Sequence, residues 1–215
     1  MFARVTWIDG AAERWATATT DDRQRIQHEL QGEPGWIATV VLADRQTGAA
    51  IAVGYWRDEE ALRASAPGHE ARMRSGEALG MRVRETEHFE IVCLERSVPP
   101  QEHTFVRVND VHATPAKLDA AIGFVREQVV PLVKAQRGFR GLVMGVNRDN
   151  GRSFVSSIWD TAADREASDA AVAEQRRQTA QLAAAEQPKV ELYEVVALLE
   201  KSQGALGAES RMSGG

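Results

Sequence analysis

The stretch that decides the fold occurs twice in this chain. Residues 35–65 read GWIATVVLADRQTGAAIAVGYWRDEEALRAS, and residues 138–168 read GFRGLVMGVNRDNGRSFVSSIWDTAADREAS. The two stretches align without a gap at an offset of 103 residues (138 − 35). Seven of the 31 aligned positions are identical, against roughly two expected from average residue usage. The unit is too long for one turn of a solenoid, so we interpret it as a small domain that has been duplicated and fused.

The match continues beyond this stretch and sets the domain organisation. Arg4 and Val5 align with Arg107 and Val108 at the same offset, and a closing FEIV motif at residue 89 corresponds to YEVV at residue 193. About 100 residues is the commonest domain size. We therefore predict a first repeat over 1–97, a linker over 98–103 with its proline pair, a second repeat over 104–201 and a disordered Gly- and Ser-rich tail over 202–215.

Composition excludes several classes of protein. The chain has 215 residues, 43% hydrophobic, and a net charge of −5, which gives no reason to expect nucleic acid or an anionic membrane as partner. Cys93 is the only cysteine, so an internal disulfide and a multi-cysteine metal site are excluded. No apolar run approaches the ~20 residues needed to cross a bilayer, and no signal peptide opens the chain. These features predict a soluble, cytoplasmic protein without a metal.

The second repeat shows the order of its elements clearly. Thr104–Val111 is typical of a strand, and Thr114 with Pro115 predicts a helix start. An apolar stripe at helical spacing continues to Val133, with a kink expected near Glu127 because Pro131 removes one backbone hydrogen bond. A strand pair over 140–147 and 153–159, a helix over 162–185 and a strand over 190–199 complete the order β-α-β-β-α-β.

This order is the ferredoxin-like α+β arrangement, which leaves one face of its sheet uncovered. That face has to be buried against another layer. Two fused copies can bury it on each other, so we predict that both antiparallel sheets pack into one intramolecular α+β barrel with the helices outside. Such a chain would be a monomer with a pseudo-dimeric barrel, and weak homo-oligomerisation is the alternative.

The two repeats differ in the apolar stripe of the first helix. Ile122 and Val125 of the second repeat align with Thr19 and Asp22 of the first. One interpretation is that the segment Thr20–Asp21 caps a shorter helix, with Asp22 in its first turn. The other is that the first repeat holds a polar, substrate-binding cavity where the second repeat holds core.

These residues together resemble a known group of proteins. Each repeat resembles an antibiotic-biosynthesis-monooxygenase domain of the dimeric α+β barrel superfamily. The resemblance rests on a helix that ends before Gly-[Trp/Phe], on the strand hairpin, on a strand that ends in Trp, and on the closing [Phe/Tyr]-Glu-[Ile/Val]-Val strand. It spans residues 2–200 and implies fold more specifically than activity, because this fold carries many functions.

The resemblance implies a cofactor-independent monooxygenase that acts on a small aromatic, phenolic or quinol-type molecule with dioxygen. It places Trp56 and Trp159 beside a pocket between helices and sheet, with Asn109 on the first strand of the second repeat as a further catalytic candidate. The alternative for both tryptophans is simple packing of helix against sheet. Tyr55 has to point to the opposite sheet face from Trp56 and therefore into the barrel if Trp56 faces the helices.

Two other functions stay open. A non-catalytic member would bind a small ligand or serve in assembly. Haem handling is a minor option. Resemblance to the haem-degrading members of the group implies a trio of Asn, Trp and an axial His. Here that trio is divided, because Asn109 and Trp159 lie in one repeat and His69 in the other, where His69 is a further substrate-binding candidate. Arg72 and its neighbours Arg74, Arg82 and Arg84 form a positive cluster that could attract an anionic substrate. Glutamates alternate with these arginines, however, which is more typical of a solvated mixed-charge surface.

Overall fold

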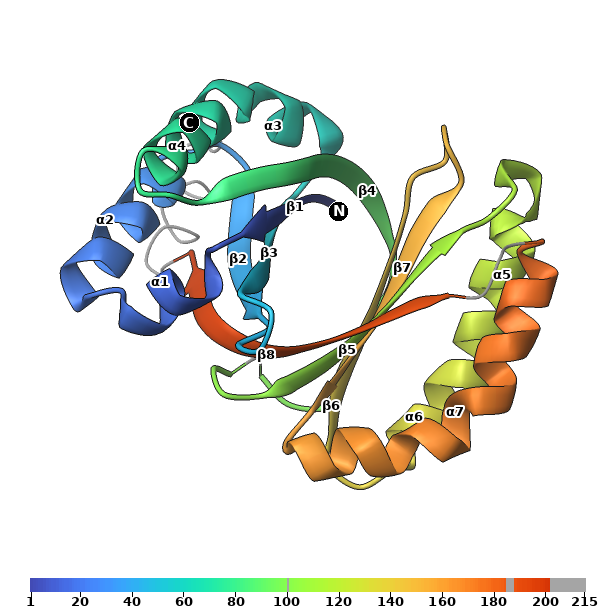
Figure 1. Cartoon of the computed structure of the whole chain (residues 1–215). Coiled ribbons are helices and arrows are strands. Elements are labelled where there is room, and N and C mark those ends of the chain that lie inside the picture. Colours follow the sequence, from blue (N-terminus) through green and yellow to red (C-terminus); the bar gives the residue numbers. More distant parts are fainter. Residues whose placement is uncertain (100, 185–187, 202–215) are drawn as a thin grey trace, which may run out of the picture.

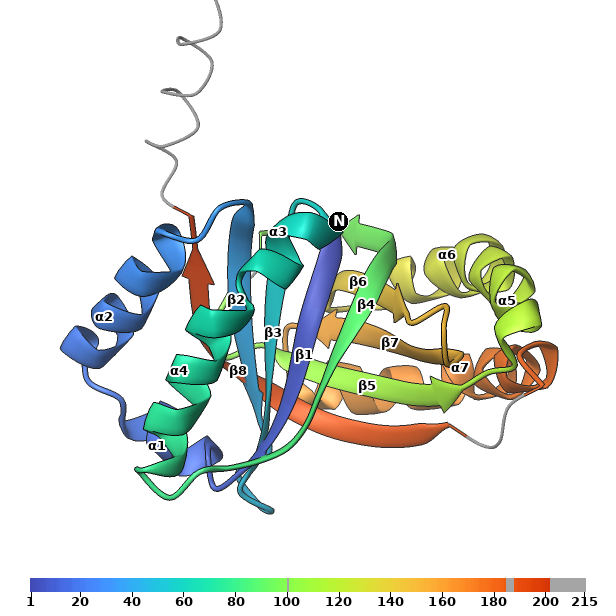
Figure 2. The same ribbon diagram turned by 90° about the horizontal axis from the view of Figure 1, so that it is seen from above.

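The eight strands form one closed barrel with the helices on its outside. The computed structural model describes residues 1–99, 101–184 and 188–201. All neighbouring strand pairs around the ring are antiparallel. Figure 1 shows the helices of the first repeat on one side of the barrel and those of the second repeat on the other, and Figure 2 shows the same separation from above.

The elements of the two repeats follow one another in the same order. The strands of the first repeat are β1 (Phe2–Asp9), β2 (Trp36–Ala43), β3 (Ala49–Trp56) and β4 (Arg82–Arg96). Those of the second are β5 (Phe105–His112), β6 (Phe139–Val146), β7 (Arg152–Trp159) and β8 (Lys189–Glu200). The strand order around the barrel is β1-β3-β2-β8-β5-β7-β6-β4. The predicted α+β barrel of two fused ferredoxin-like repeats is therefore confirmed, with strand ends within about two residues of those expected.

The repeats pair with each other at two seams, β2 with β8 and β4 with β6. The barrel interior is one apolar cluster with side chains from both repeats, including Trp7, Phe89, Phe154 and Tyr193. Tyr55 packs against this cluster. Its predicted direction, into the barrel, is thus correct, and burial raises the pKa of its hydroxyl to about 12.

The glycine that precedes the aromatic residue in both repeats is required by the backbone. Gly35 and Gly138 both have positive φ, 69° and 73°, a conformation that side chains rarely adopt. A Cβ at Gly138 would also lie 2.6 Å from Asp164 of the following helix, and one at Gly35 would lie 2.6 Å from Ala61. The identity at this position therefore reflects the turn into β2 and β6 and the close approach of a helix.

The helices of the second repeat cover their sheet continuously. After a short 3-10 turn, η1 (Pro115–Lys117), the first helix runs through α5 (Leu118–Phe124), a π-helical segment η2 (Val125–Val129) and α6 (Val130–Lys134). The Val130 N–H donates to the Val125 carbonyl, so the expected loosening before Pro131 takes the form of one π turn. Helix α7 (Ala162–Leu182) is unbroken, and one large cluster joins both helices to the sheet.

The helices of the first repeat are broken instead. The first is divided into α1 (Ala12–Thr17) and α2 (Thr20–Gln31), and the second into α3 (Glu59–Ala64) and α4 (Ala66–Glu77). Three small clusters replace the single helix–sheet core of the second repeat. The covering layer is therefore discontinuous over the first sheet.

The break in the first helix explains one of the mismatched pairs. Thr19 caps α2: its hydroxyl accepts from the Asp22 N–H at 3.2 Å, and the Asp22 carboxylate accepts from the Thr19 N–H at 3.3 Å. This reciprocal capping box satisfies two helix-end donors and lowers the pKa of Asp22, chiefly through the Thr19 hydroxyl. The capping interpretation is confirmed, with the cap at Thr19 rather than at Thr20.

In the described residues, no helix combines the length and the apolar character needed to cross a bilayer. The tail predicted over 202–215 lies outside the described residues. The exact limits proposed for the two repeats and their linker stay a prediction, although Phe2–Arg96 and Phe105–Glu200 bound the two sets of elements.

Candidate functional site

The broken helices of the first repeat leave a cavity of about 660 Å³ between themselves and the sheet. Its walls come from β1, β2 and β3 on the sheet side and from α1, α2 and α4 on the other. The lining side chains fall into two groups, a charged group where Trp56 lies and an apolar group beside the far end of β1. The residues used below are Arg4, Thr6, Trp56, Glu33, His69 and Arg72, with Ile8, Trp15, Met73 and Met81 at the apolar end.

Arg4 is the central charged residue of this cavity. It is only 3% exposed, and its guanidinium lies 5.0 Å from the centroid of the Trp56 ring, within cation–π range. Its Nη2 donates to the Leu62 carbonyl at 2.7 Å and its Nη1 to the Ser65 hydroxyl at 2.9 Å. Burial lowers the pKa of Arg4 to about 10, so the group stays cationic at neutral pH.

His69 extends from the first turns of α4 to the same cavity. Burial, followed by the charges of Arg4 and Arg72, lowers its pKa to about 4. The imidazole is therefore neutral at physiological pH and has a free ring nitrogen that can accept a proton. Among the described residues the ring makes no hydrogen bond.

Glu33 and Arg72 form an ion pair at the edge of the cavity. Glu33 Oε1 lies 2.6 Å from Arg72 Nη2, and the side chains are 12% and 16% exposed. The pair lacks hydrogen-bond geometry, and neither carboxylate oxygen has a hydrogen-bond partner among the described residues. A carboxylate held only by charge in a buried position is weakly satisfied.

Trp56 and Trp159 occupy equivalent positions but have different surroundings. The Trp159 Nε1 donates to the Ser157 hydroxyl at 3.0 Å. In the first repeat Gly54 replaces that serine, and a Cβ there would lie 2.5 Å from the Trp56 ring. The Trp56 Nε1 is buried without an acceptor in the described part of the chain. The ring can fold back along β3 only because Gly54 has no side chain.

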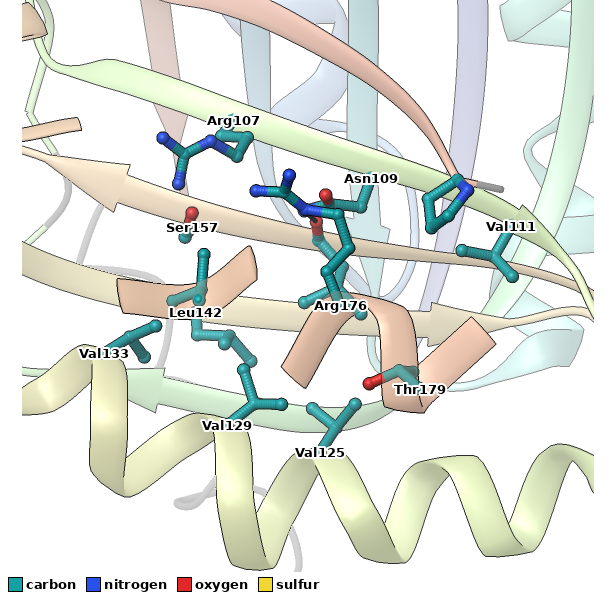
Figure 3. A pocket seen from close by; sticks show the side chains of 13 residues that line it. Arg107, Asn109, Val111, Val125, Val129, Val133, Leu142, Ser157, Arg176 and Thr179 are labelled. Atoms are coloured by element: carbon teal, nitrogen blue, oxygen red, sulfur yellow. Dashed lines mark hydrogen bonds between the residues drawn. The ribbon is translucent and has the colours of Figure 1, made fainter. Parts of the chain in front are cut away.

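The second repeat contains the same pocket in a nearly filled form, with a volume of about 50 Å³. Arg107, Asn109, Ser157 and Val172 line it at the positions of Arg4, Thr6, Gly54 and His69. Figure 3 shows Val125, Val129 and Val133 extending from their helix toward the sheet. Larger apolar side chains thus occupy most of the space that is open in the first repeat.

The candidates from the sequence are distributed between these two places. Trp56 and His69 line the large cavity together. Asn109 lines the small pocket, where its Nδ2 donates to the Val155 carbonyl at 3.2 Å. Trp159 is fully buried against Phe139 in the helix–sheet core.

The remaining three candidates lie elsewhere. Tyr55 faces the barrel interior, on the opposite side of the sheet from the cavity. Thr19 and Asp22 are exposed in their capping box and do not line the cavity. The structure does not bring these three side chains together with Trp56 and His69.

The sequence analysis did not select Arg4, Glu33 or Arg72 as site residues. The signal for Arg4 was its recurrence, because the Arg4-Val5 pair reappears at residue 107. An arginine conserved between the repeats in a largely apolar strand is unusual. Arg72 was assigned to a solvated mixed-charge surface, which is correct for Arg74 but wrong for Arg72, whose side chain is only 16% exposed. Nothing in the sequence distinguishes Glu33 from an ordinary loop residue.

Comparison with known proteins places the chain in a family. No protein-family model matches it. It is 30% identical over 162 residues to the uncharacterized protein Rv2557 of Mycobacterium tuberculosis, covering 75% of this chain and 72% of that protein. The uncharacterized protein Rv2558 of the same organism is 29% identical over 73% of this chain and 66% of its own length. The chain belongs to the family of these mycobacterial proteins.

Solved structures add the fold relationship. An anthrone oxidase-like protein superimposes with a TM-score of 0.66 at 16% identity, over 94% of both chains. A Listeria monocytogenes ferredoxin-fold protein related to antibiotic biosynthesis monooxygenases gives 0.53 at 7% identity, over 91% and 95%. A haem-degrading enzyme from Listeria monocytogenes gives 0.50 at 7%, over 89% and 99%. These structures show that the chain shares the α+β barrel fold of the proteins compared, which is the fold that the resemblance implied.

Proposed function

We propose that the large cavity of the first repeat is the active site of a cofactor-independent monooxygenase for a small phenolic or quinol-type substrate, with dioxygen as its co-substrate. The observation that supports this most is the neutral His69 beside the buried cation of Arg4 in a cavity of about 660 Å³. A base, a cation and an aromatic wall are the groups that such chemistry needs from a protein.

The reaction requires a substrate that supplies its own electrons. His69 accepts the proton of a hydroxyl or enol group, and the organic anion passes one electron to dioxygen. The two radicals combine to form a C–O bond, the resulting peroxide takes the proton back from His69, and loss of water from the hydroperoxide leaves a carbonyl group. One oxygen atom is then in the product and the other in water, and four electrons have left the substrate.

Charge in the cavity adjusts this proton transfer. A base whose pKa is about 4 would remove a proton from a phenol in water very unfavourably. However, the positive charges of Arg4 and Arg72 that lower the pKa of His69 also stabilise a bound phenolate, so they lower the pKa of the substrate as well. Burial strengthens this effect because the local dielectric is low.

Oxygen uptake with a panel of hydroquinones and anthrones tests the proposal. We expect uptake with the unchanged protein, loss of at least about 100-fold in His69→Val, which introduces the residue of the second repeat, and a smaller loss in Trp56→Phe. Trp159→Phe is the matched control, because that ring lies in the core of the other repeat. Binding of panel members without any oxygen uptake would instead identify a non-catalytic ligand-binding protein.

Haem is a different occupant for the same cavity, and the residues fit it poorly. Thr6 stands where the second repeat has Asn109, and Val172 stands where the first has His69. The set associated with haem-degrading relatives is therefore divided between two pockets. Addition of hemin checks this directly, since a shifted Soret band that is lost in His69→Val would favour haem.

A further inference from the structure

The two equivalent buried arginines differ in their negative partners. In the second repeat, Arg107 Nη2 lies 3.5 Å from Asp169 Oδ1. The position of Asp169 is occupied in the first repeat by Ala66. Within the described residues Arg4 has no ion pair; its three hydrogen bonds go to the His88 ring, the Ser65 hydroxyl and the Leu62 carbonyl. A buried cation without an ion pair is costly, and the charge of Glu33, which raises the pKa of Arg4, offsets this cost only in part.

A second cation lies beside each buried arginine, and its partner differs between the repeats. In the second repeat Arg176 lines the small pocket and pairs with Asp169 at 2.6 Å, so Asp169 lies between two arginines. Arg72 and Glu33 of the first repeat align with Gln175 and Gln136 of the second, so the ion pair exists only where the cavity is large. Arg4, Arg72 and Glu33 together carry one net positive charge. A bound monoanion would neutralise this group.

The position of Glu33 allows a ligand to replace its carboxylate as the partner of Arg72. Its carboxylate lacks hydrogen bonds among the described residues and lies over Gly68, where a Cβ would be 2.6 Å from Oε1. The side chain comes from the loop that follows α2, so it can swing away without disturbing a helix or strand. Exchange of this carboxylate for an oxygen anion of a ligand would keep the charge on Arg72 compensated and give its guanidinium proper hydrogen bonds.

The other end of the cavity has the opposite character. Ile8, Trp15, Met73 and Met81 pack together there, and all of them line the cavity. On β1, Arg4 and Ile8 are four residues apart, which corresponds to about 13 Å along a strand. The flexible thioethers of methionine adapt to apolar groups of different shape.

We propose that this cavity binds an elongated amphipathic organic anion, with its charged oxygen between Arg4 and Arg72 in place of the Glu33 carboxylate and its apolar end beside Met73 and Met81. The proposal rests on the proposed function for the location of the site and narrows its substrate class. A carboxylate and a phenolate provide the same oxygen anion, and the experiment separates them.

Isothermal titration of the full chain with 4-butylbenzoate, 4-butylbenzamide and 4-butylphenol at pH 7 tests the charge requirement. We expect the benzoate to bind at least about tenfold more tightly than the neutral amide, as is usual for a charge-assisted hydrogen bond. The phenol should bind weakly at pH 7 and more tightly as the pH approaches its own pKa. Shortening the butyl chain to ethyl should weaken binding by roughly fourfold for each methylene removed.

Three variants and one control assign the effect to the proposed residues. Arg72→Gln, which introduces the residue of the second repeat, should remove the preference for the benzoate, whereas Glu33→Gln and Gly68→Ala should strengthen benzoate binding. Arg74→Gln, on the same helix but 69% exposed, should bind as the unchanged protein does. Thermal melting confirms that each variant is folded.

The proposal is overturned if the benzoate and the amide bind equally, if no member of the series binds, or if Arg72→Gln and Arg74→Gln behave alike. These outcomes are distinct from failure of the proposed function. Tight benzoate binding with no oxygen uptake from any phenol would overturn only the oxygenase, and uptake from neutral phenols with no preference for anions would overturn only this inference.

Discussion

The two repeats have the same backbone order but use the space between helices and sheet differently. The second repeat fills that space with one continuous core, and a pocket of about 50 Å³ is left. The first repeat divides its core into three small clusters around a cavity of about 660 Å³. One copy of the duplicated domain thus stabilises the barrel, and the other has room for a ligand.

Side-chain size on the sheet accounts for much of the difference. Val155 and Leu142 of the second repeat align with Ala52 and Thr39 of the first, and all four line their respective pockets. Helix breaks add to it, because α4 begins anew at Ala66 while α7 continues without interruption. The positions at which the duplicated domain differs from itself therefore indicate the open repeat better than the positions that both copies share.

The largest difference in stability between the two repeats is expected at the two equivalent tryptophans. Trp159→Ala should lower the free energy of unfolding by about 3–5 kcal/mol, because a fully buried ring leaves a new cavity in a continuous core. Trp56→Ala should cost roughly half as much, since one side of the Trp56 ring already borders a cavity. Urea unfolding followed by circular dichroism measures both, and equal losses would show that the first repeat is packed as tightly as the second.

An exchange of one wall residue between the repeats gives the next largest effect. Val155→Ala should destabilise the protein by about 2 kcal/mol through lost burial and a larger void. Ala52→Val places two extra methyl groups in existing space, so it should be neutral or stabilise by about 1 kcal/mol while weakening ligand binding. Denaturant midpoints of the two variants decide this; a destabilising Ala52→Val would mean that the cavity wall cannot accept added volume.

The pH dependence of stability should reveal His69, which has no counterpart in the second repeat. Its pKa is about 4 in the folded chain, below its ordinary value of 6.5. Between these pH values the imidazole is therefore protonated in the unfolded chain and neutral in the folded chain. Stability should therefore fall as the pH drops from 6.5 toward 4. His69→Val should remove that part of the decline, whereas His28→Gln, on the exposed face of α2, should leave it. Melting temperatures between pH 4 and 8 provide the measurement, and identical profiles for the unchanged protein and His69→Val would refute it.

The smallest effect is expected at the helix cap. Thr19→Ala should cost about 1 kcal/mol of stability, which is typical for loss of an N-cap side chain. Ligand binding should not change, because the capping box faces solvent outside the cavity. A weakened affinity in Thr19→Ala with unchanged stability would restore Thr19 as a substrate-binding residue.

Most of the fold could be predicted because it depends on patterns that are local in the sequence. Each of the signals involved spans only a few residues. They are the repeat at residues 35 and 138, the alternating strands and the turn glycines. Burial of the open sheet faces then leaves few ways to join two copies. The break in the first helix was partly visible, since Thr20 and Asp21 are ordinary start signals of a helix and the actual cap lies one residue earlier.

The site was harder to predict because its residues are far apart in the chain. Arg4, Glu33 and Arg72 come from a strand, a loop and a helix, and no spacing rule joins them. Glu33 and Arg72 look like surface residues until the fold shows that both are largely buried. Trp56 was identified as a candidate, but its difference from Trp159 depends on Gly54, which matters only because the ring folds back over it.

By itself, the sequence determined that one domain occurs twice and that the copies share an order of elements, a Gly-aromatic turn and an Arg-Val pair. Only the tertiary structure decided which copy is filled and which is open. The physical reason is that periodicity and turn chemistry act between near neighbours in the chain, whereas a cavity is the volume left after side chains from distant elements have packed.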